Sequence, residues 1–189
     1  MKKDISKVLF SKTDIKKAIK RVGTELTKKY KNQQVTILSL LNGSFIFTAD
    51  LIREIEAEVD VKFLKVKSYE GSSSSGVLNV ENGFKFSDLD NKHVLIVDDI
   101  LDTGLTLDTI CRKIRNETEA LSVTSCVLLD KQVKRKIMRS ADFTCFKIPN
   151  EFVVGYGLDY NEKYRNLPYI GILNEKVYSN SCPVHSTNV

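Results

Sequence analysis

An unbroken apolar run that ends in two carboxylates constrains the fold more than any other stretch of this chain. The run HVLIVDD covers residues 93 to 99, and the four residues between His93 and Asp98 are all aliphatic. Strands that are covered on both faces are continuous apolar runs of this kind, because the helices of a parallel sheet pack on both of its sides. The run therefore predicts a central strand of a parallel sheet.

Helix-like and strand-like segments alternate along the rest of the chain. Residues 13–30 place apolar side chains at helical spacing, with Thr13 as the expected N-cap. Helical spacing returns after Gly43 and after Gly104. Expected strands or extended runs cover 35–41, 59–69, 122–130, 142–148 and 152–159. This alternation predicts a mostly parallel α/β sheet of about five strands. Because no repeat or proline-rich linker divides the sequence, we expect a single domain over residues 1–189.

The composition of the chain limits the kinds of molecule that we expect it to bind. The chain is long enough to bury a core without disulfides, and 42% of its residues are hydrophobic. A net charge of +5 mildly favours anionic partners, including phosphorylated small molecules, but is too small to imply duplex DNA. The sequence has neither an apolar leader nor an apolar run of membrane-spanning length. We therefore expect a soluble cytoplasmic protein without a membrane partner.

The four cysteines predict neither disulfides nor a metal site. Cys111, Cys126 and Cys145 lie in segments that have the pattern of buried helix or strand, so we interpret them as reduced core thiols. Cys182 and His185 are close in sequence, but two ligands in a polar tail are too few for a metal site.

The turn after the apolar run gathers charge where open α/β sheets bind their ligands, beyond the carboxyl ends of the strands. Asp98, Asp99 and Asp102 lie there, and neighbouring carboxylates repel each other unless cations or hydrogen-bond donors offset the repulsion. The sequence DTGLT follows, with two hydroxyls, a glycine that permits close backbone approach, and the first N–H groups of a helix. The turn therefore suits a sugar phosphate, with a diol or metal at one end and phosphate at the other.

Two other interpretations of the acidic turn remain open at this point. Asp98 and Asp99 could simply end a strand while Asp102 caps the following helix. A receiver domain also holds magnesium with an acidic pair at a strand end. Receiver domains are shorter, however, and their pair lies near the chain start rather than in mid-chain.

With these residues in view, VLIVDDILDTGLT (94–106) resembles the ribose-phosphate signature of the phosphoribosyltransferases. LNGSFIF, KSY before a serine-rich segment, LLDK, and FVVGYGLDYNEKYRNLPYIGIL resemble the hypoxanthine-guanine members, in the same order and over nearly the whole chain. The resemblance implies a type I phosphoribosyltransferase fold, a mostly parallel central sheet flanked by helices with a small hood from the chain ends.

The resemblance also implies a transferase of purine salvage. Such an enzyme moves 5-phosphoribosyl from phosphoribosyl pyrophosphate to a 6-oxopurine, giving IMP or GMP and pyrophosphate. It implies Mg²⁺ as cofactor, a homodimer or homotetramer, and no nucleic-acid partner.

Each matching residue takes an implied role. Asp98 and Asp99 accept hydrogen bonds from the ribose hydroxyls, directly or through magnesium, and Asp102 is the general base at purine N7. Asp159 is a further magnesium contact. The 5-phosphate is held by Thr103, Gly104 and Thr106.

The purine is contacted by Lys131, which donates to O6, by the stacked ring of Phe152 and by the backbone of Val153. Val154 is expected in the core. The other basic residues after Lys131 are interpreted as a solvated segment, namely Lys134, Arg135, Lys136 and Arg139.

Pyrophosphate is expected to meet Arg165 and the backbone of a loop at Asn42 and Gly43, where the family often has a cis peptide. Many relatives have Lys or Arg in place of Asn42, so here we expect the backbone contact without the charged side chain. Ser68, Tyr69 and the mobile loop 70–76 match a lid that closes during reaction, and residues 179–189 are expected to form a flexible tail.

Two functional alternatives differ from this prediction. A non-catalytic regulator could keep the phosphoribosyl pyrophosphate site and bind RNA or DNA, because a fold does not determine a function. Such a regulator has no need of a purine pocket. A transferase for another base, such as xanthine or a pyrimidine, is the second alternative, since Lys131 and Phe152 favour an oxopurine without ranking the oxopurines.

Overall fold

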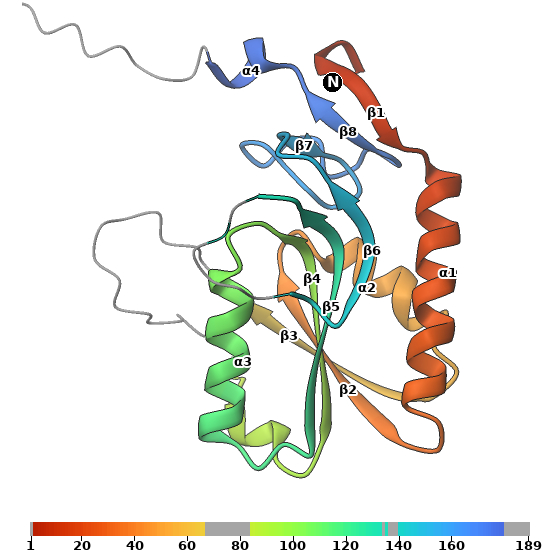
Figure 1. Ribbon diagram of the computed structural model, residues 1–189, viewed down its shortest axis with the longest axis vertical. Helices are drawn as coiled ribbons and strands as arrows, with labels where there is room; N and C mark the ends of the chain where they lie inside the picture. The colour runs from red at the N-terminus through yellow and green to blue at the C-terminus, as the bar shows by residue number, and fades with distance from the viewer. Residues whose placement is uncertain (1, 67–83, 134, 136–139, 180–189) are drawn as a thin grey trace, which may run out of the picture.

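The computed structural model describes residues 2–66, 84–133, 135 and 140–179, and its centre is a five-stranded sheet (Figure 1). All neighbouring strands of this sheet are parallel, in the order β3-β2-β4-β5-β6. Their bounds are β2 Gln34–Leu41, β3 Glu58–Lys65, β4 His93–Leu101, β5 Ser122–Lys131 and β6 Phe143–Ile148. The apolar run of residues 94–97 lies in β4, the middle strand, which confirms the prediction of a covered central strand.

Helices cover both faces of the sheet. The side chains of Leu95 and Val97 join the core under α1 and α2, whereas Val94 and Ile96 join the core under α3 and η2 (Figure 1). This alternation is what a strand with two buried faces requires. The bounds are α1 Lys12–Lys29, α2 Phe45–Ile52, η2 Phe86–Leu89 and α3 Leu105–Glu117.

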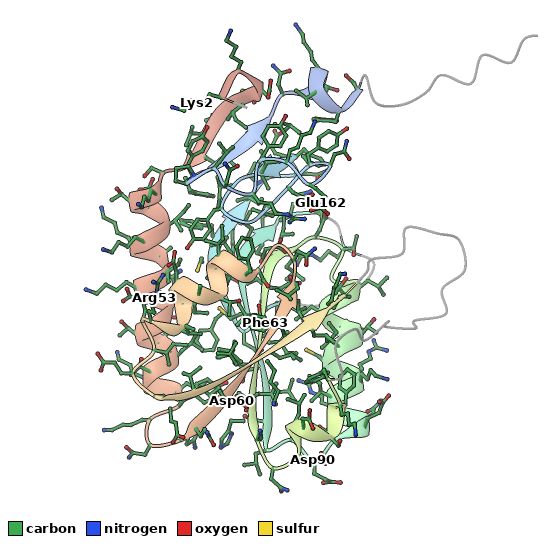
Figure 2. The ribbon with its side chains drawn as sticks, turned by 180° about the vertical axis from the view of Figure 1, so that it is seen from behind. Lys2, Arg53, Asp60, Phe63, Asp90 and Glu162 are labelled. Carbon is green, nitrogen blue, oxygen red and sulfur yellow. The ribbon has the colours of Figure 1, made fainter. Side chains whose placement is uncertain are left out.

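A second, antiparallel sheet forms a hood at the carboxyl ends of the parallel strands. It has the order β1-β8-β7, with β1 Ile5–Phe10, β7 Val153–Val154 and β8 Ile170–Leu173. Short helices flank it, η1 Lys2–Asp4 and α4 Glu175–Ser179. In Figure 2, Lys2 and Glu162 lie at the hood end of the molecule and Asp90 lies at the opposite end. The predicted hood from both chain ends is confirmed.

The N-cap of helix α1 lies two residues before the expected one. Ser11 is the N-cap, because its hydroxyl accepts from the Asp14 backbone N–H at 3.2 Å while the Asp14 carboxylate accepts from the Ser11 N–H at 3.0 Å. The choice of Thr13 was therefore wrong, and the S-x-x-D pattern of a capping box was the missed signal. The predicted apolar face is buried, comprising Ile15, Ala18, Ile19, Val22 and Leu26.

The extended run predicted over 152–159 is strand only at Val153 and Val154. The chain then turns, because Gly155 and Gly157 have φ angles of 100° and 101°. Such angles are readily adopted only by glycine. Val154 is fully buried, as predicted for a core residue.

The cysteines within the described residues behave as predicted. Cys111, Cys126 and Cys145 are buried and free of disulfide bonds. Burial raises the pKa of the Cys145 thiol to about 12, so the group is a neutral core side chain. Over the same described ranges, every helix is too short or too polar to cross a bilayer.

Candidate active site

The acidic turn and the Asn42–Gly43 loop meet at the carboxyl ends of β4 and β2. A Cβ atom placed on Gly43 would lie 1.5 Å from Oδ2 of Asp99, so a side chain at this position would displace the carboxylate. The Leu41–Asn42 peptide bond is cis. Sequence reasoning had placed both segments in one site but gave no contact between them.

A buried hydroxyl network, which sequence reasoning missed, supports the same loop. The Ser39 hydroxyl lies 2.8 Å from the hydroxyls of both Ser44 and Thr48, and all three residues are buried. Because β2, the loop and α2 each contribute one of the three, the network fixes where α2 leaves the sheet. Each hydroxyl of the network has a hydrogen-bond partner. A buried hydroxyl without a partner would lower the stability of the fold.

Asp98 and Asp99 form a pair of carboxylates with raised pKa values. Burial is the main reason that the pKa of Asp98 lies well above its ordinary value, and the charge of Asp99 adds to the rise. Burial also raises the pKa of Asp99, although a hydrogen bond from Asp98 and the charge of Arg165 act in the opposite direction. A cation or hydroxyl donors at this pair would favour its ionised form.

The loop that follows β7 docks onto the same place through its glycine. A Cβ atom on Gly157 would lie 2.2 Å from the carbonyl oxygen of Gly43, so these two backbones touch. The Arg165 guanidinium donates to the Gly157 carbonyl at 2.9 Å and pairs with the Asp159 carboxylate at 3.0 Å. Arg165 and Asp159, both predicted site residues, are thus brought to the Asn42–Gly43 loop.

The start of α3 is a turn without a side-chain cap. Gly104 is the N-cap, has a φ of 83°, and as a glycine has no side chain that could cap the helix. The Thr103 hydroxyl accepts from the Leu105 N–H at 3.3 Å, and Thr106 lies in the first turn of the helix. Asp102 is therefore not the cap, and the capping interpretation of that residue was wrong. The N–H groups at such a helix start are suited to bind an anion.

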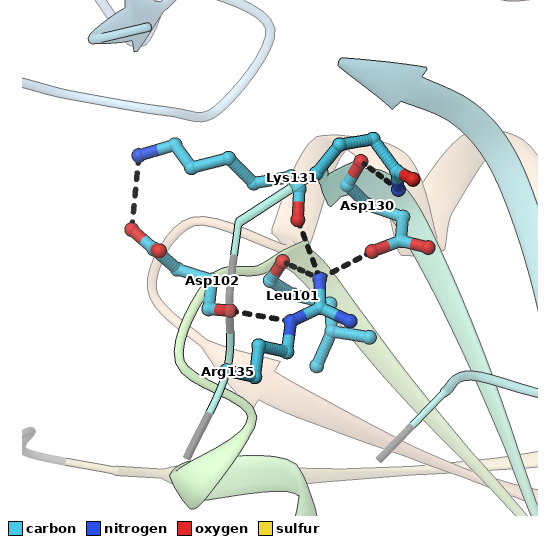
Figure 3. Close-up of polar contacts among 6 residues, drawn as sticks. Leu101, Asp102, Asp130, Lys131 and Arg135 are labelled. Carbon is cyan, nitrogen blue, oxygen red and sulfur yellow. Dashed lines mark hydrogen bonds and ion pairs between the residues drawn. The ribbon is translucent and has the colours of Figure 1, made fainter. Parts of the chain in front are cut away.

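Asp102 is paired with Lys131 across the ends of β4 and β5. The Lys131 Nζ atom lies 3.0 Å from Oδ2 of Asp102, as Figure 3 shows. The Asp102 side chain is 48% exposed, whereas that of Lys131 is 12% exposed. The structure therefore places the Asp102 carboxylate, a hydrogen-bond acceptor, beside the Lys131 ammonium, a donor. Both groups are predicted to contact the purine.

Arg135 contradicts the interpretation of the basic segment as solvated. Its side chain is only 12% exposed and donates to the backbone carbonyls of Leu101, Asp102 and Lys131, at 2.8, 2.7 and 2.7 Å (Figure 3). It also pairs with the Asp130 carboxylate. Its three basic neighbours in the earlier interpretation, Lys134, Lys136 and Arg139, lie outside the described residues.

Phe152 belongs to an aromatic cluster at the hood. Its ring is stacked on Tyr178 at a centroid distance of 5.2 Å, meets the edge of Tyr160 at 5.5 Å, and is still 38% exposed. The next residue, Val153, is buried and pairs with Ile172 of β8. Sequence reasoning missed both tyrosines, because Tyr178 is distant in sequence and no local pattern marks it.

The remaining predicted site residues cannot be placed. Ser68, Tyr69 and the loop 70–76 lie outside the described residues, as do Cys182 and His185. Of the expected tail 179–189, only Ser179 is described, as the last residue of α4.

The comparisons with known proteins agree with this geometry. The family model of the Phosphoribosyl transferase domain matches residues 8–161. The chain belongs to the phosphoribosyltransferase family. A hypoxanthine-guanine phosphoribosyltransferase of Streptococcus pneumoniae is 48% identical to it over 181 residues, which are 95% of this chain and 99% of that protein.

Solved structures show the same relationship. A hypoxanthine phosphoribosyltransferase of Staphylococcus aureus superimposes with a TM-score of 0.88 at 42% identity, covering 95% of this chain and 97% of that one. One of Trypanosoma cruzi, solved as a ternary substrates complex, gives a TM-score of 0.86 at 38% identity, covering 93% and 99%. The type I phosphoribosyltransferase fold predicted from the sequence is confirmed.

The acidic groups of this phosphoribosyltransferase fit a metal that takes few protein ligands. Within the described ranges, no three His, Cys, Asp or Glu side chains form a ready metal cage. Asp98 and Asp99 are adjacent, and the Arg165 that pairs with Asp159 also acts on the charge of Asp99. Mg²⁺ is commonly held by one or two carboxylates together with substrate phosphates, so this donor set suits it.

Proposed function

We propose that this phosphoribosyltransferase transfers the 5-phosphoribosyl group of phosphoribosyl pyrophosphate to hypoxanthine or guanine, giving IMP or GMP and pyrophosphate. The observation that carries the proposal is the pairing of Asp102 and Lys131 at 3.0 Å. The relatives named above as hypoxanthine or hypoxanthine-guanine phosphoribosyltransferases support it.

The pair suits one edge of a 6-oxopurine. O6 and N7 lie side by side on that edge of the base. An ammonium only donates hydrogen bonds, so Lys131 would donate to O6, and the Asp102 carboxylate would accept the N7 proton as N9 attacks. Adenine carries an amino group where the oxopurines carry O6, so it would leave Lys131 without an acceptor.

The ribose and its phosphate would occupy the turn between β4 and α3. Asp98 and Asp99 would accept hydrogen bonds from the two ring hydroxyls, and their charge would stabilise the oxocarbenium-like ribose as pyrophosphate leaves. Thr103, Gly104 and Thr106 with the first amides of α3 would hold the 5-phosphate. The uncapped start of α3 supports this assignment.

The pyrophosphate would lie at the Asn42–Gly43 loop and Arg165, with Mg²⁺ as the cofactor. Asp98, Asp99 and Asp159 would hold the ion, directly or through water, and the ion would neutralise the charge of the leaving group. The contact between the Gly43 and Gly157 backbones supports a shared site for these groups. Phe152, with Val153 beside it, would cover the purine, and Ser68, Tyr69 and the loop 70–76 would close over the reacting atoms.

We further propose a cytoplasmic homodimer or homotetramer. Three buried cysteines of the described residues, Cys111, Cys126 and Cys145, form no disulfide bond, which suits a reducing compartment. The exposed rings of Phe45 and Phe63 suit burial against another subunit, and Figure 2 shows Phe63 on β3, which is an edge strand. Light scattering coupled to size exclusion measures the subunit number, and a monomer at all concentrations would contradict the assembly.

A panel of bases tests the activity. With phosphoribosyl pyrophosphate and Mg²⁺, we expect hypoxanthine and guanine to be converted and adenine to be a poor substrate, as followed by the ultraviolet spectra of the nucleotides. Adding EDTA should stop the reaction and excess Mg²⁺ should restore it. Binding of phosphoribosyl pyrophosphate without conversion of any base would instead favour a non-catalytic regulator.

The Lys131→Met variant tests the purine contact. Methionine keeps an unbranched side chain but removes the ammonium, so the donor to O6 and the ion pair with Asp102 are lost together. A hydrogen bond to a charged group contributes about 1.5–3 kcal/mol, so the Kd of hypoxanthine should rise roughly ten- to a hundredfold. The Kd of phosphoribosyl pyrophosphate should change little.

Isothermal titration calorimetry measures both constants for this variant. Lys20→Met, at an exposed position of α1 far from the site, is the matched control and should bind both ligands like the wild type. An unchanged hypoxanthine affinity in Lys131→Met would remove Lys131 from the base site.

A further inference from the structure

The guanidinium of Arg135 lies where the β4–β5 ladder ends. The last paired residues of the two strands are Leu101 and Asp130, and beyond them the chains separate toward Asp102 and Lys131. Arg135 donates to the carbonyls of Leu101 and Asp102 on one strand end and of Lys131 on the other (Figure 3).

The two strand ends that Arg135 joins carry the two side chains assigned to the purine. Asp102 and Lys131 are each held by a backbone carbonyl bond to Arg135, at 2.7 Å in both cases. The Asp130 carboxylate, nearly buried beside them, pairs with the same guanidinium and offsets its charge. Arg135 therefore sets the distance between the backbones of Asp102 and Lys131. It does not itself lie at the position proposed for the purine.

Only arginine has the donor geometry for this position. A guanidinium presents five N–H groups in one rigid plane, whereas the ammonium of lysine is a compact charge with three donors. Nε donates to the Asp102 carbonyl, while the two N–H groups of Nη2 are shared among the Leu101 carbonyl, the Lys131 carbonyl and the Asp130 carboxylate. The planar guanidinium holds Nε and Nη2 at a fixed separation, so it bonds to both strand ends at once. A lysine at this position would keep the charge and lose the simultaneous contacts.

We propose that Arg135 is a positioning residue for the purine site, holding Asp102 and Lys131 at the spacing that lets one oxopurine edge meet both. This inference rests on the proposed function, because it assigns to Arg135 the geometry that the proposed base contact needs. Arg135 acts through Asp102 and Lys131 and contacts no substrate.

The positioning role predicts a loss confined to the purine side of the reaction. In Arg135→Lys, kcat/KM for hypoxanthine should fall by roughly a hundredfold, the size of effect that a small misplacement of reacting groups produces. The Kd of phosphoribosyl pyrophosphate should rise much less than this, because Asp98, Asp99 and Arg165 keep their contacts and only the Asp102 carbonyl, which precedes Thr103, loses its bond to Arg135. Steady-state kinetics and calorimetry on the full chain measure the two quantities.

Arg21→Lys is the matched control. Arg21 also donates its guanidinium to two backbone carbonyls, of Thr144 and Cys145 at 2.9 and 3.1 Å, but these lie in β6, outside the site. Losing the bonds of Arg21 to these two carbonyls should leave the kinetics with both substrates near those of the wild type. A comparable fall in both variants would show a general stabilising effect and would overturn the positioning role.

Chemical rescue separates positioning from simple destabilisation. In Arg135→Ala, millimolar methylguanidinium should restore part of the hypoxanthine turnover, while methylammonium should not, because only the former has the planar donors. If Arg135→Ala does not fold, as judged by circular dichroism, Arg135→Lys carries the test alone. A wild-type hypoxanthine rate in Arg135→Lys, or equal losses for purine and phosphoribosyl pyrophosphate, would overturn the inference.

Failure of the proposed function is distinguishable from failure of this inference. If the wild type converts neither hypoxanthine nor guanine, the proposed function fails and the role of Arg135 fails with it. If the wild type is active and Arg135→Lys is unimpaired, only the inference fails.

Discussion

The Asp102→Asn variant is expected to lower the single-turnover rate of phosphoribosyl transfer by roughly 10²–10⁴-fold, the usual contribution of a general base. Asparagine keeps the shape of the side chain but cannot take the N7 proton, and it also loses its charge against Lys131. The Kd of phosphoribosyl pyrophosphate should be nearly unchanged, because that ligand is proposed to lie at Asp98, Asp99 and the start of α3.

Rapid-quench measurement of IMP formation and calorimetry with phosphoribosyl pyrophosphate give the two values for Asp102→Asn. Asp60→Asn is the control, since Asp60 also pairs with lysines but lies in β3 away from the site, as Figure 2 shows. A similar loss of rate and of phosphoribosyl pyrophosphate affinity in Asp102→Asn would make Asp102 a binding residue instead of the base.

The second large effect is expected from Gly157→Ala. The new Cβ atom would approach the Gly43 carbonyl to 2.2 Å, and neither backbone can move without opening the contact between the two loops. The φ of 101° adds about 1–3 kcal/mol of backbone strain for a residue with a side chain. We expect the melting temperature to fall by roughly 2–4 °C for each kcal/mol lost, and the affinity for pyrophosphate to fall at least about tenfold because its loop is displaced.

Asn161→Ala is the matched control for Gly157→Ala. Asn161 also has a positive φ, of 50°, but it is exposed, so alanine there adds strain without meeting the Gly43 loop. Differential scanning calorimetry and pyrophosphate titration distinguish the two variants. A pyrophosphate Kd in Gly157→Ala equal to that of Asn161→Ala would mean that the backbone contact does not shape the site.

The parts of the fold that follow from local periodicity could be predicted. The apolar run in β4, the buried face of α1 and the glycine turn before α3 each have a pattern that is complete within a few residues. The errors were also local. The S-x-x-D box begins at Ser11, two residues before the predicted cap Thr13, and glycines turn the chain within the predicted extended run after Phe152.

The contacts that join distant segments could not be read from the sequence. Arg135 stands among other basic residues, which is the usual pattern of a solvated segment, and only the ends of β4 and β5 supply the carbonyls that bury it. Tyr178 is similar, because nothing near it indicates that its ring lies on Phe152. The roles of the predicted site residues stay predictions, while the placement of Asp99, Asp102, Lys131 and Arg165 is compatible with them.

The hood has a consequence for how the molecule is made. Strand β1 is synthesised more than 150 residues before its pairing partner β8, which spans residues 170–173. The Leu173 N–H also donates to the Phe152 carbonyl at 2.8 Å. A nascent chain can therefore assemble the parallel sheet early, since domains fold as synthesis proceeds, but its hood can close beside Phe152 only after residues 170–173 have been translated.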